Sequence, residues 1–216
     1  MSTESGKSAT KAHPDTLLRG VEVYSGLLDG AEQAALLAEI RGVAAAAPMV
    51  HPVMRSGKQM SVRMTSAGRL GWVSDQGGYR YQRHHPSGVP WPPIPAPVLD
   101  IWHRVTGLAR MPDCCLVNFY SEGARLGMHQ DRDEGNFDWP VVSVSLGDEG
   151  LFRVGNIERG GKTESIWLRS GDVLVMGGAA RLVHHGVDRI RFGTSTLLPK
   201  GGRINLTLRV VDQGST

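Results

Sequence analysis

The sequence predicts a mainly β protein with flanking helices, and three observations lead to this class. Glycine supplies 28 of the 216 residues, about twice its usual share, which indicates many turns and therefore many short strands. From residue 115 onward, segments that alternate or are rich in β-branched residues follow one another, separated by turn residues. No long helix comes between them, so we predict an antiparallel sandwich or jelly roll, the double-stranded β-helix.

The predicted strands lie mainly in the C-terminal half of the chain. They are CLVNFY (115–120), PVVSVSLG (140–147), LFRVG (151–155), SIWLRSGDVLVMGG (165–178) and RINLTLRVV (203–211). In the N-terminal part, VEVYSGLL (21–28) favours one further strand.

Two helices are predicted before this β-rich region. Asp29 reads as an N-cap with Glu32 three residues later, a capping-box-like pattern, and apolar residues follow at helical spacing. This helix should end before Pro48. A second helix is expected at about 96–107, after a run of prolines.

We divide the chain into four parts within one structural domain, residues 17–216. Residues 1–16 are small and polar and are predicted to be a disordered tail. Residues 17–48 hold the first strand and helix, and 98–216 form the core of the domain. Residues 49–97 interleave aromatic, methionine and basic side chains with glycines and prolines, so we interpret them as short hairpins that form a cover.

Composition and charge exclude several classes of protein. No apolar run approaches the length of a membrane-spanning helix, and the first residues lack the apolar region of a secretory signal. The two cysteines, Cys114 and Cys115, are adjacent, which excludes a disulfide framework and favours a reducing cytoplasm. A net charge of +3 argues against a tight non-specific coat on nucleic acid but permits a local basic patch.

A candidate metal site begins at His129-Gln130-Asp131. On an extended segment, residues two apart face the same side, so His129 and Asp131 can both point at one ion. His184 or His185 could supply a third ligand. Two histidines and a carboxylate that leave an open coordination face suit Fe(II) oxygenases. The alternative is a loop pair with no metal.

The segment RINLTLR (203–209) alternates strictly between polar and apolar residues. On a strand, Arg203, Asn205 and Arg209 share one face with Thr207, and the apolar residues share the other. By itself the pattern also fits an amphipathic edge strand with a solvated face. Beside the candidate iron site, however, two converging arginines form a receptor for a dicarboxylate such as 2-oxoglutarate.

These segments together resemble a known family. NFYSEGARLGMHQDRDE (118–134), RLVHHGV (181–187) and RINLTLR are similar, in order, to the alkylation-repair dioxygenases of the AlkB family. MSVRMTSAGRLGWVSDQGGYRY (60–81) and PVVSVSLG also resemble them, so the likeness runs from about residue 18 to 210.

The resemblance implies a function and its cofactors. Fe(II), 2-oxoglutarate and O₂ would generate a ferryl oxidant that hydroxylates methyl groups on ring nitrogens, as in 1-methyladenine and 3-methylcytosine. Formaldehyde, succinate and CO₂ would be released, which amounts to direct-reversal DNA repair. The implied partner is methylated single- or double-stranded DNA, with RNA as an alternative. The sequence shows neither a membrane segment nor an oligomer interface, so we expect a cytoplasmic monomer.

The resemblance also implies roles for individual residues. The metal ligands would be His129, Asp131 and His185, the last because it precedes Gly186 as in the HG pair of the family. The 2-oxoglutarate site would comprise Asn118, Phe119, Tyr120, Arg203, Asn205 and Arg209, with Arg203 on the distal carboxylate and Arg209 near the metal-bound end. The substrate contacts would be Trp72, Tyr79, Arg80, Tyr81, Asp133 and Arg159. Of these, Trp72 would stack on the damaged base within a nucleotide-recognition lid, and Asp133 would face the base edge.

Three positions depart from the pattern of the family. Ile204 and His184 stand where close relatives often carry tyrosine, and Arg153 where a neutral polar residue is common. These departures leave the expected chemistry unchanged and the substrate preference open. Hydroxylation of a protein side chain, demethylation of cellular RNA and a non-enzymatic binding role are the competing hypotheses.

Overall fold

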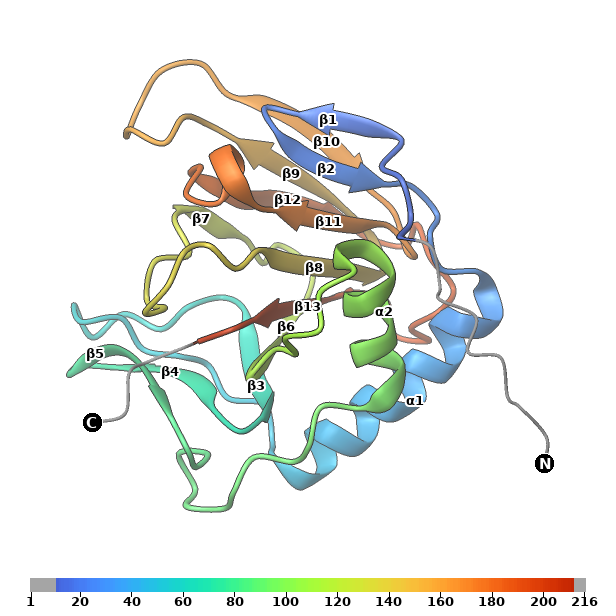
Figure 1. Cartoon of the computed structure of the whole chain (residues 1–216). Coiled ribbons are helices and arrows are strands. Elements are labelled where there is room, and N and C mark those ends of the chain that lie inside the picture. Colours follow the sequence, from blue (N-terminus) through green and yellow to red (C-terminus); the bar gives the residue numbers. More distant parts are fainter. Residues whose placement is uncertain (1–10, 212–216) are drawn as a thin grey trace, which may run out of the picture.

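The computed structural model describes residues 11–211, which form two helices, a short 3₁₀ helix (Gly178–Ala180) and thirteen strands (Figure 1). The helices are α1 (Gly30–Ala46) and α2 (Ala96–Thr106). The first strands are β1 (Thr16–Leu18), β2 (Val21–Tyr24), β3 (Arg63–Gly68), β4 (Gly71–Asp75), β5 (Gly78–Gln82) and β6 (Cys114–Tyr120). The others are β7 (Leu126–His129), β8 (Val141–Gly147), β9 (Glu149–Val154), β10 (Glu164–Leu168), β11 (Val173–Met176), β12 (His185–Arg191) and β13 (Arg203–Arg209).

The strands form three antiparallel sheets. The large sheet has seven strands in the order β1-β2-β11-β8-β13-β6-β3. A smaller sheet has the order β10-β9-β12-β7, and β4 and β5 pair as a separate hairpin. The mainly β class with flanking helices is therefore confirmed.

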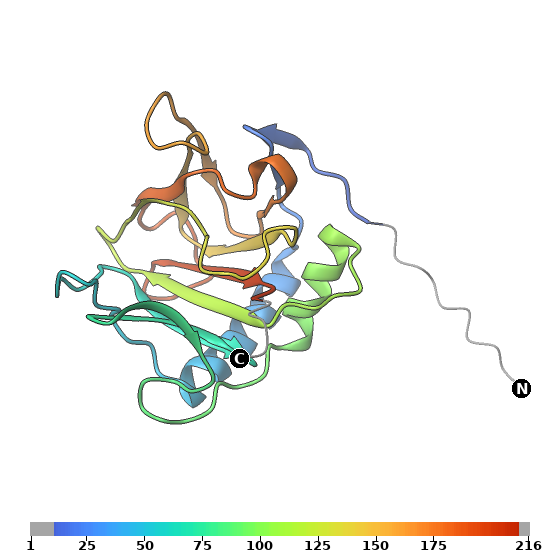
Figure 2. The ribbon, with the colours of Figure 1, turned by 60° about the vertical axis from the view of Figure 1, so that its left-hand side comes forward.

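Both helices cover one face of the large sheet, as Figures 1 and 2 show. Leu36 and Ile40 of α1 and Trp102 of α2 pack in the same buried cluster as Val144 and Leu206 of the sheet. Trp102 is completely buried, and its indole N–H donates to the carbonyl of Arg110 (3.0 Å). Full burial of one large apolar side chain contributes about 1.5–3 kcal/mol, so this layer holds the large sheet in place from behind.

The other face of the large sheet turns toward the small sheet. Phe152 and Val154 of β9 and Leu168 of β10 pack there with Leu174 and Met176 of β11. This contact holds the two sheets together along one part of their length. Between them, beyond this contact, lies a cavity lined by both polar and apolar side chains.

Strand β13 lies in the interior of the large sheet, between β6 and β8, and all seven of its residues are buried. Ile204, Leu206 and Leu208 pack on the helix side. Arg203 and Arg209 lie on the opposite face, toward the small sheet. The alternative of a solvated edge strand is therefore wrong: the polar face of the predicted strand is not solvated but lines an internal cavity.

The two predicted helices are confirmed at their ends. The Asp29 carboxylate accepts from the backbone N–H of Glu32 (2.8 Å), and Glu32 accepts in return from Asp29 N–H (2.9 Å). Helix α1 ends at Ala46, before Pro48, and α2 spans nearly the predicted range. Neither helix in residues 11–211 is long and apolar enough to cross a membrane.

Predicted segment 165–178 divides into two strands in different sheets. Strand β10 belongs to the small sheet and β11 to the large one. At the turn, Gly171 has a φ of 90°, a left-handed conformation that glycine adopts without strain. The Asp172 carboxylate accepts from the backbone N–H of Arg169 (2.7 Å) and fixes the same turn. Residues 169–172, Arg-Ser-Gly-Asp, interrupt the apolar pattern and signal a turn, but they do not reveal that the strands on either side belong to different sheets.

Two predicted boundaries also shift. Part of the predicted cover, β3, pairs with β6 and is the edge strand of the large sheet. In the predicted tail, residues 1–10 lie outside the described residues. Ala12 donates to the carbonyl of Arg104 in α2 (2.8 Å) and Thr16 begins β1, so ordered backbone starts before residue 17.

Replacing Asp29 by alanine removes the N-cap bond of α1. We expect the free energy of unfolding to fall by about 1 kcal/mol, the usual cost of losing such a cap. Urea denaturation followed by circular dichroism measures it. The matched control is Glu39→Ala, an exposed residue of the same helix, which should stay within about 0.5 kcal/mol of wild type. Equal effects of the two substitutions would refute the capping assignment.

Candidate metal centre and active site

Three side chains singled out in the sequence meet between β7 and β12. His129 ends β7, His185 begins β12, and the two are direct cross-strand partners. Asp131 lies in the loop just after β7. One candidate ligand atom from each residue lies within 4.8 Å of the other two. The carboxylate of Asp131 is 3.6 Å from Nε2 of His129 and 3.9 Å from Nε2 of His185.

Hydrogen bonds to the backbone orient both imidazole rings. Nδ1 of His129 lies 2.9 Å from the carbonyl of Gly127, and Nδ1 of His185 lies 3.0 Å from the carbonyl of Val183. A carbonyl only accepts, so in these hydrogen bonds Nδ1 carries the proton. In a neutral ring Nε2 then keeps its lone pair, and both Nε2 atoms are turned toward Asp131.

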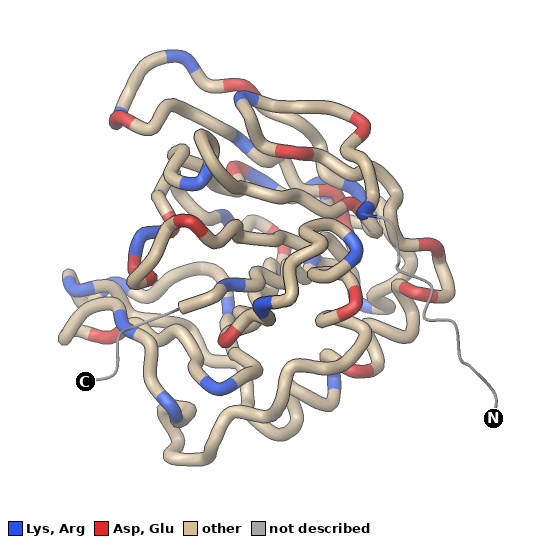
Figure 3. Tube along the Cα trace, in the orientation of Figure 1, with Lys and Arg blue, Asp and Glu red and all other residues tan. Residues whose placement is uncertain are grey.

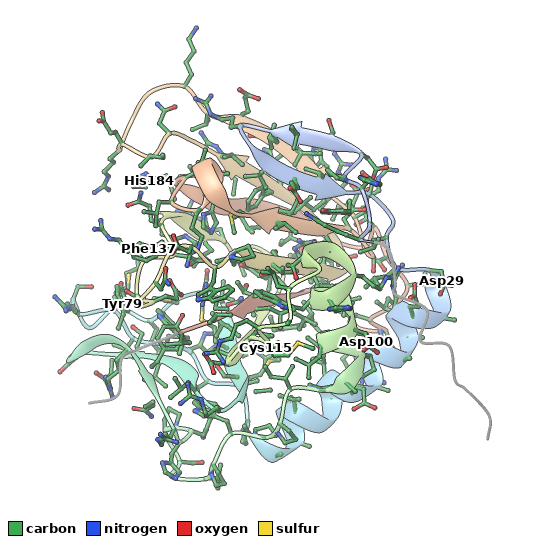
Figure 4. All side chains as sticks on the ribbon, viewed as in Figure 1. Asp29, Tyr79, Asp100, Cys115, Phe137 and His184 are labelled. Carbon is green, nitrogen blue, oxygen red and sulfur yellow. The ribbon has the colours of Figure 1, made fainter. Side chains whose placement is uncertain are left out.

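The same geometry distinguishes the two neighbouring histidines. Nδ1 of His184 lies 3.1 Å from the carbonyl of Asn156, and this side chain is not part of the cluster. In Figure 4 it lies near the left-hand edge of the molecule. After His185, a side chain on Gly186 would come within 2.6 Å of the Leu126 carbonyl. Only glycine therefore lets β12 approach β7 closely enough to pair the two ligand histidines.

The surroundings hold Asp131 and His185 in the charge states that suit metal binding. Burial by itself would raise the pKa of Asp131, but Arg209 and the two imidazoles outweigh it and hold this pKa well below its usual range. Burial, with a contribution from His129, lowers the pKa of His185 to about 4. A carboxylate and a neutral imidazole are the forms that bind a divalent ion.

The candidate metal site opens into a cavity of about 760 Å³ between the two sheets. Its polar side includes Asn118 and Tyr120 of β6 and the outward face of β13. Phe152 and Leu168 of the small sheet supply an apolar wall. Trp72 of the β4–β5 hairpin also lines it. The cavity thus joins a metal site, two arginines and an aromatic side chain.

Arg203 is a buried cation with neutral hydrogen-bond partners. Its guanidinium donates to the hydroxyl of Ser145 (2.7 Å) and to the carbonyls of Asp148 and Leu168 (3.3 and 3.4 Å). Within residues 11–211, its Nε has no hydrogen-bond partner, and neither does the buried Oδ1 of Asn118. Burial lowers the pKa of Arg203 to about 10. A buried guanidinium without a carboxylate is costly, so this end of the cavity is built to receive an anion.

Arg209 is in the opposite situation. Its Nη2 and Nε donate to the two oxygens of Asp131 (2.7 and 3.2 Å), and Nε is also 3.3 Å from the carboxylate of Glu134. Burial acts to lower the pKa of Arg209, but these carboxylates raise it well above its usual range. The two arginines of β13 therefore differ: among the described residues Arg209 has carboxylate partners, whereas Arg203 has only neutral ones.

Comparison with known proteins agrees with this site. Residues 20–209 match the model of the 2OG-Fe(II) oxygenase superfamily. The chain is 50% identical over 199 residues to the alpha-ketoglutarate-dependent dioxygenase AlkB homolog of Caulobacter vibrioides, covering 92% of this chain and 90% of that protein. It is 38% identical to AlkB of Escherichia coli over 84% of this chain and 85% of that protein. The chain belongs to the AlkB family.

A solved structure supports the same assignment. The structure of OsALKBH1 superposes with a TM-score of 0.75 at 30% identity, over 90% of this chain and 98% of that one. As an AlkB-family enzyme, the chain is a dioxygenase that depends on Fe(II) and 2-oxoglutarate.

The residues present fit both groups. Two imidazoles and a carboxylate with an open face are the donors that suit Fe(II) in oxygenases. The buried guanidinium of Arg203, whose Nε donor is without a partner among the described residues, provides an anion receptor in the same cavity. Asn205, which bonds Ser143 and the carbonyl of Val144, completes this polar floor.

Three of the residues expected at the substrate lie together at the cavity. Trp72 and Tyr79 stack with ring centroids 5.4 Å apart and planes 22° apart. The indole N–H of Trp72 donates to the carboxylate of Asp133 (2.9 Å). Tyr79 is 44% exposed and lies at the left-hand edge of Figure 4. All three line the same cavity as the metal ligands.

Other expected contacts do not line this cavity. The alternation of β6 sends the ring of Phe119 to the opposite face from Asn118, where it packs under the guanidinium of Arg63 (4.7 Å). Tyr81 is buried, and its hydroxyl bonds to Glu134. Strand alternation alone implies the orientation of Phe119, whereas the contact of Tyr81 with Glu134 is decided by the tertiary structure.

Arg80 and Arg159 are also outside this cavity. Arg80 forms two hydrogen bonds with Asp75 across the β4–β5 turn (2.7 and 3.0 Å) and lines a separate cavity behind the hairpin. Arg159 lies exposed in the loop between β9 and β10. Neither arginine touches the metal cavity in this structure.

Sequence reasoning missed two buried residues, Glu134 and Arg181. Arg181 donates to Glu134 (3.1 Å) and to the backbone carbonyl of Asp131 (2.6 Å). Both residues fall inside the segments that carry the family resemblance, but no spacing rule links them. Their relation to the metal site exists only in three dimensions.

Replacing His129 by alanine removes one of the three metal ligands. We expect affinity for Fe(II), or for Co(II) as a spectroscopic substitute, to fall at least about tenfold, since coordination depends on a complete donor set. Metal titration by calorimetry measures it. The control is His184→Ala, whose ring is outside the cluster and which should retain wild-type affinity. Equal loss in the two variants would contradict the ligand assignment.

Replacing Arg203 by methionine tests the anion receptor. Hydrogen bonds to charged groups contribute about 1.5–3 kcal/mol each, so we expect KM for 2-oxoglutarate to rise at least about tenfold. The variant should fold and bind metal, because Arg203 has no carboxylate partner within the described chain to leave uncompensated. An unchanged KM would show that the co-substrate binds elsewhere.

Proposed function

We propose that this enzyme oxidatively removes methyl groups from ring nitrogens of nucleobases in DNA, as in 1-methyladenine and 3-methylcytosine, with RNA as the alternative substrate. One observation carries the proposal: the aromatic pair Trp72–Tyr79 and the carboxylate of Asp133 lie in one cavity with the metal ligands. A flat cationic base matches this combination better than an aliphatic protein side chain does.

The base would enter between the Trp72 indole and the metal ligands. Stacking on an aromatic face is worth about 1–3 kcal/mol per base, whatever the base. N-methylation at the pairing position makes adenine and cytosine cationic, and the nearby negative charge of Asp133 would favour these forms. Because the methyl group also disrupts pairing, the damaged base leaves the stack more easily than a normal base.

Basic side chains around the cavity support a nucleic-acid substrate. Lys58, Arg125 and Arg132 line it. Figure 3 shows Lys and Arg along the left-hand edge of the molecule, interspersed with acidic residues. This arrangement suits contact with a few phosphates, in keeping with a net charge of only +3.

The chain’s own residues would bind and orient the reactants. Arg203 would hold the distal carboxylate of 2-oxoglutarate, and Asn118 and Asn205 would offer polar contacts beside it. Phe152 and Leu168 would exclude water from the apolar wall. When bound, iron, 2-oxoglutarate and dioxygen would supply the oxidation: 2-oxoglutarate would lose carbon dioxide and take one oxygen atom to become succinate, and the other oxygen atom would go to the methyl carbon, which then leaves as formaldehyde.

The proposal also assigns roles to parts of the fold. Residues 98–216 would be a double-stranded β-helix core with residues 17–48 behind it. Residues 49–97 would be the nucleotide-recognition lid, with β4 and β5 as its hairpin. The facing sheets with the metal ligands between them, and the separate β4–β5 hairpin beside the cavity, support this assignment.

The proposed activity is tested with single-stranded oligonucleotides that carry one 1-methyladenine or 3-methylcytosine. With Fe(II), 2-oxoglutarate and air, we expect mass spectrometry to show loss of the methyl group and release of formaldehyde. His129→Ala serves as the inactive control. Matched DNA and RNA strands identify the preferred polymer. Absence of demethylation on both would contradict the proposal and favour a protein substrate.

Replacing Asp133 by asparagine tests the electrostatic part of the proposal. The amide oxygen can still accept from Trp72, but the negative charge is gone. We expect kcat/KM to fall more for cationic 1-methyladenine than for neutral 1-methylguanine, while affinity for 2-oxoglutarate persists. If the ratio of the two kcat/KM values stays at the wild-type level, the charge of Asp133 does not select the lesion.

A further inference from the structure

One side chain connects the β4–β5 hairpin to the metal centre through buried groups. Tyr81 of β5 is 7% exposed, and its hydroxyl donates to the carboxylate of Glu134 (2.5 Å). In the hairpin, Tyr81 is the direct cross-strand partner of Trp72, so both side chains project from the same face. Trp72, which is proposed to stack on the base, and Tyr81, which bonds Glu134, are therefore neighbours on the same face of the hairpin.

The connection continues from Glu134 to a metal ligand. The buried carboxylate of Glu134 lies 3.3 Å from Nε of Arg209. Arg209 binds both oxygens of Asp131, and its Nη1 lies 3.4 Å from the hydroxyl of Tyr81. Tyr81, Glu134, Arg209 and Asp131 thus form a continuous chain of buried polar contacts.

Arg181 closes this chain into a network. It donates to Glu134 (3.1 Å) and also to the backbone carbonyl of Asp131 (2.6 Å), so the ligand is held by both its side chain and its main chain. Two arginines and two carboxylates balance in charge. At low local dielectric the position of each group depends on the others, and losing one contact shifts the rest.

We infer that Tyr81 and Glu134 are positioning residues that couple occupation of the base site to the orientation of the metal-binding carboxylate of Asp131. This inference rests on the proposed function for the role of Trp72, and adds to it an energetic link between the lid and the metal. A base that binds against Trp72 would shift the β4–β5 hairpin. Because the Tyr81 hydroxyl contacts Glu134 and Arg209, this shift would also move those two side chains. Neither Tyr81 nor Glu134 need touch the substrate.

The link is measurable as thermodynamic coupling without turnover. Co(II) is titrated into the protein with 2-oxoglutarate, in the presence and absence of a single-stranded oligonucleotide containing 3-methylcytosine. We expect the oligonucleotide to change Co(II) affinity about fivefold or more in the wild type and to alter the visible Co(II) spectrum. By reciprocity, Co(II) must change oligonucleotide affinity by the same factor.

Tyr81→Phe removes one hydroxyl and leaves the ring in place. We expect it to abolish the coupling factor and the spectral change, while Co(II) affinity in the absence of oligonucleotide persists. Glu134→Gln should act in the same direction. The matched control is Tyr24→Phe, because the Tyr24 hydroxyl also donates to a glutamate, Glu22 (2.6 Å), but near the opposite edge of the large sheet.

The outcomes separate this inference from the proposed function. If the oligonucleotide changes Co(II) affinity as much in Tyr81→Phe as in Tyr24→Phe, the inference is overturned. The contacts of Tyr81 and Glu134 would then only stabilise the fold. A wild type that binds and demethylates the oligonucleotide but shows no coupling would overturn the inference alone. A wild type that does not bind the oligonucleotide would overturn both.

Discussion

The burial of two arginines on one face of β13 is the constraint on which the rest of this site depends. Burial of a guanidinium is costly unless it forms hydrogen bonds or ion pairs, and for these two arginines the partners come from other segments of the chain. For Arg209 the partners are Asp131 and Glu134, which fixes the loop after β7. For Arg203 the described residues supply only neutral partners, which supports its proposed role as the receptor for a carboxylate of 2-oxoglutarate.

The metal site follows from this arrangement together with one strand register. Because His129 and His185 pair directly across β7 and β12, a single register places both imidazoles beside the carboxylate that Arg209 holds. A shift of one residue would turn each ring to the other face of the sheet. Gly186 permits that register, because the side chain of any larger residue would collide with the β7 backbone. Backbone packing and the candidate metal site therefore both require the register in which His129 pairs with His185.

Much of the fold and of the site could be predicted from the chain itself. The capping box at Asp29, the glycine-rich spacing of short strands and the alternation of β13 each express a local rule of backbone geometry. The spacing of His129 and Asp131 pointed to a candidate metal site because residues two apart on an extended segment share a face, although Asp131 lies just beyond the end of β7. The choice of His185 over His184 needed the family resemblance; the structure supports it through the different hydrogen bonds of the two rings.

Local pattern determined which residue types alternate, where helices begin and which side chains can bind a metal. Tertiary structure alone decided that β13 is an interior strand, that residues 165–178 divide between two sheets, and that Tyr81 turns inward to Glu134. The physical reason is that a periodic pattern is local in the sequence. It shows which face of a strand or helix is polar, but not whether water or another buried group lies opposite that face. Partners from sequence-distant segments, such as Glu134 and Arg181, settle that question only when the chain folds.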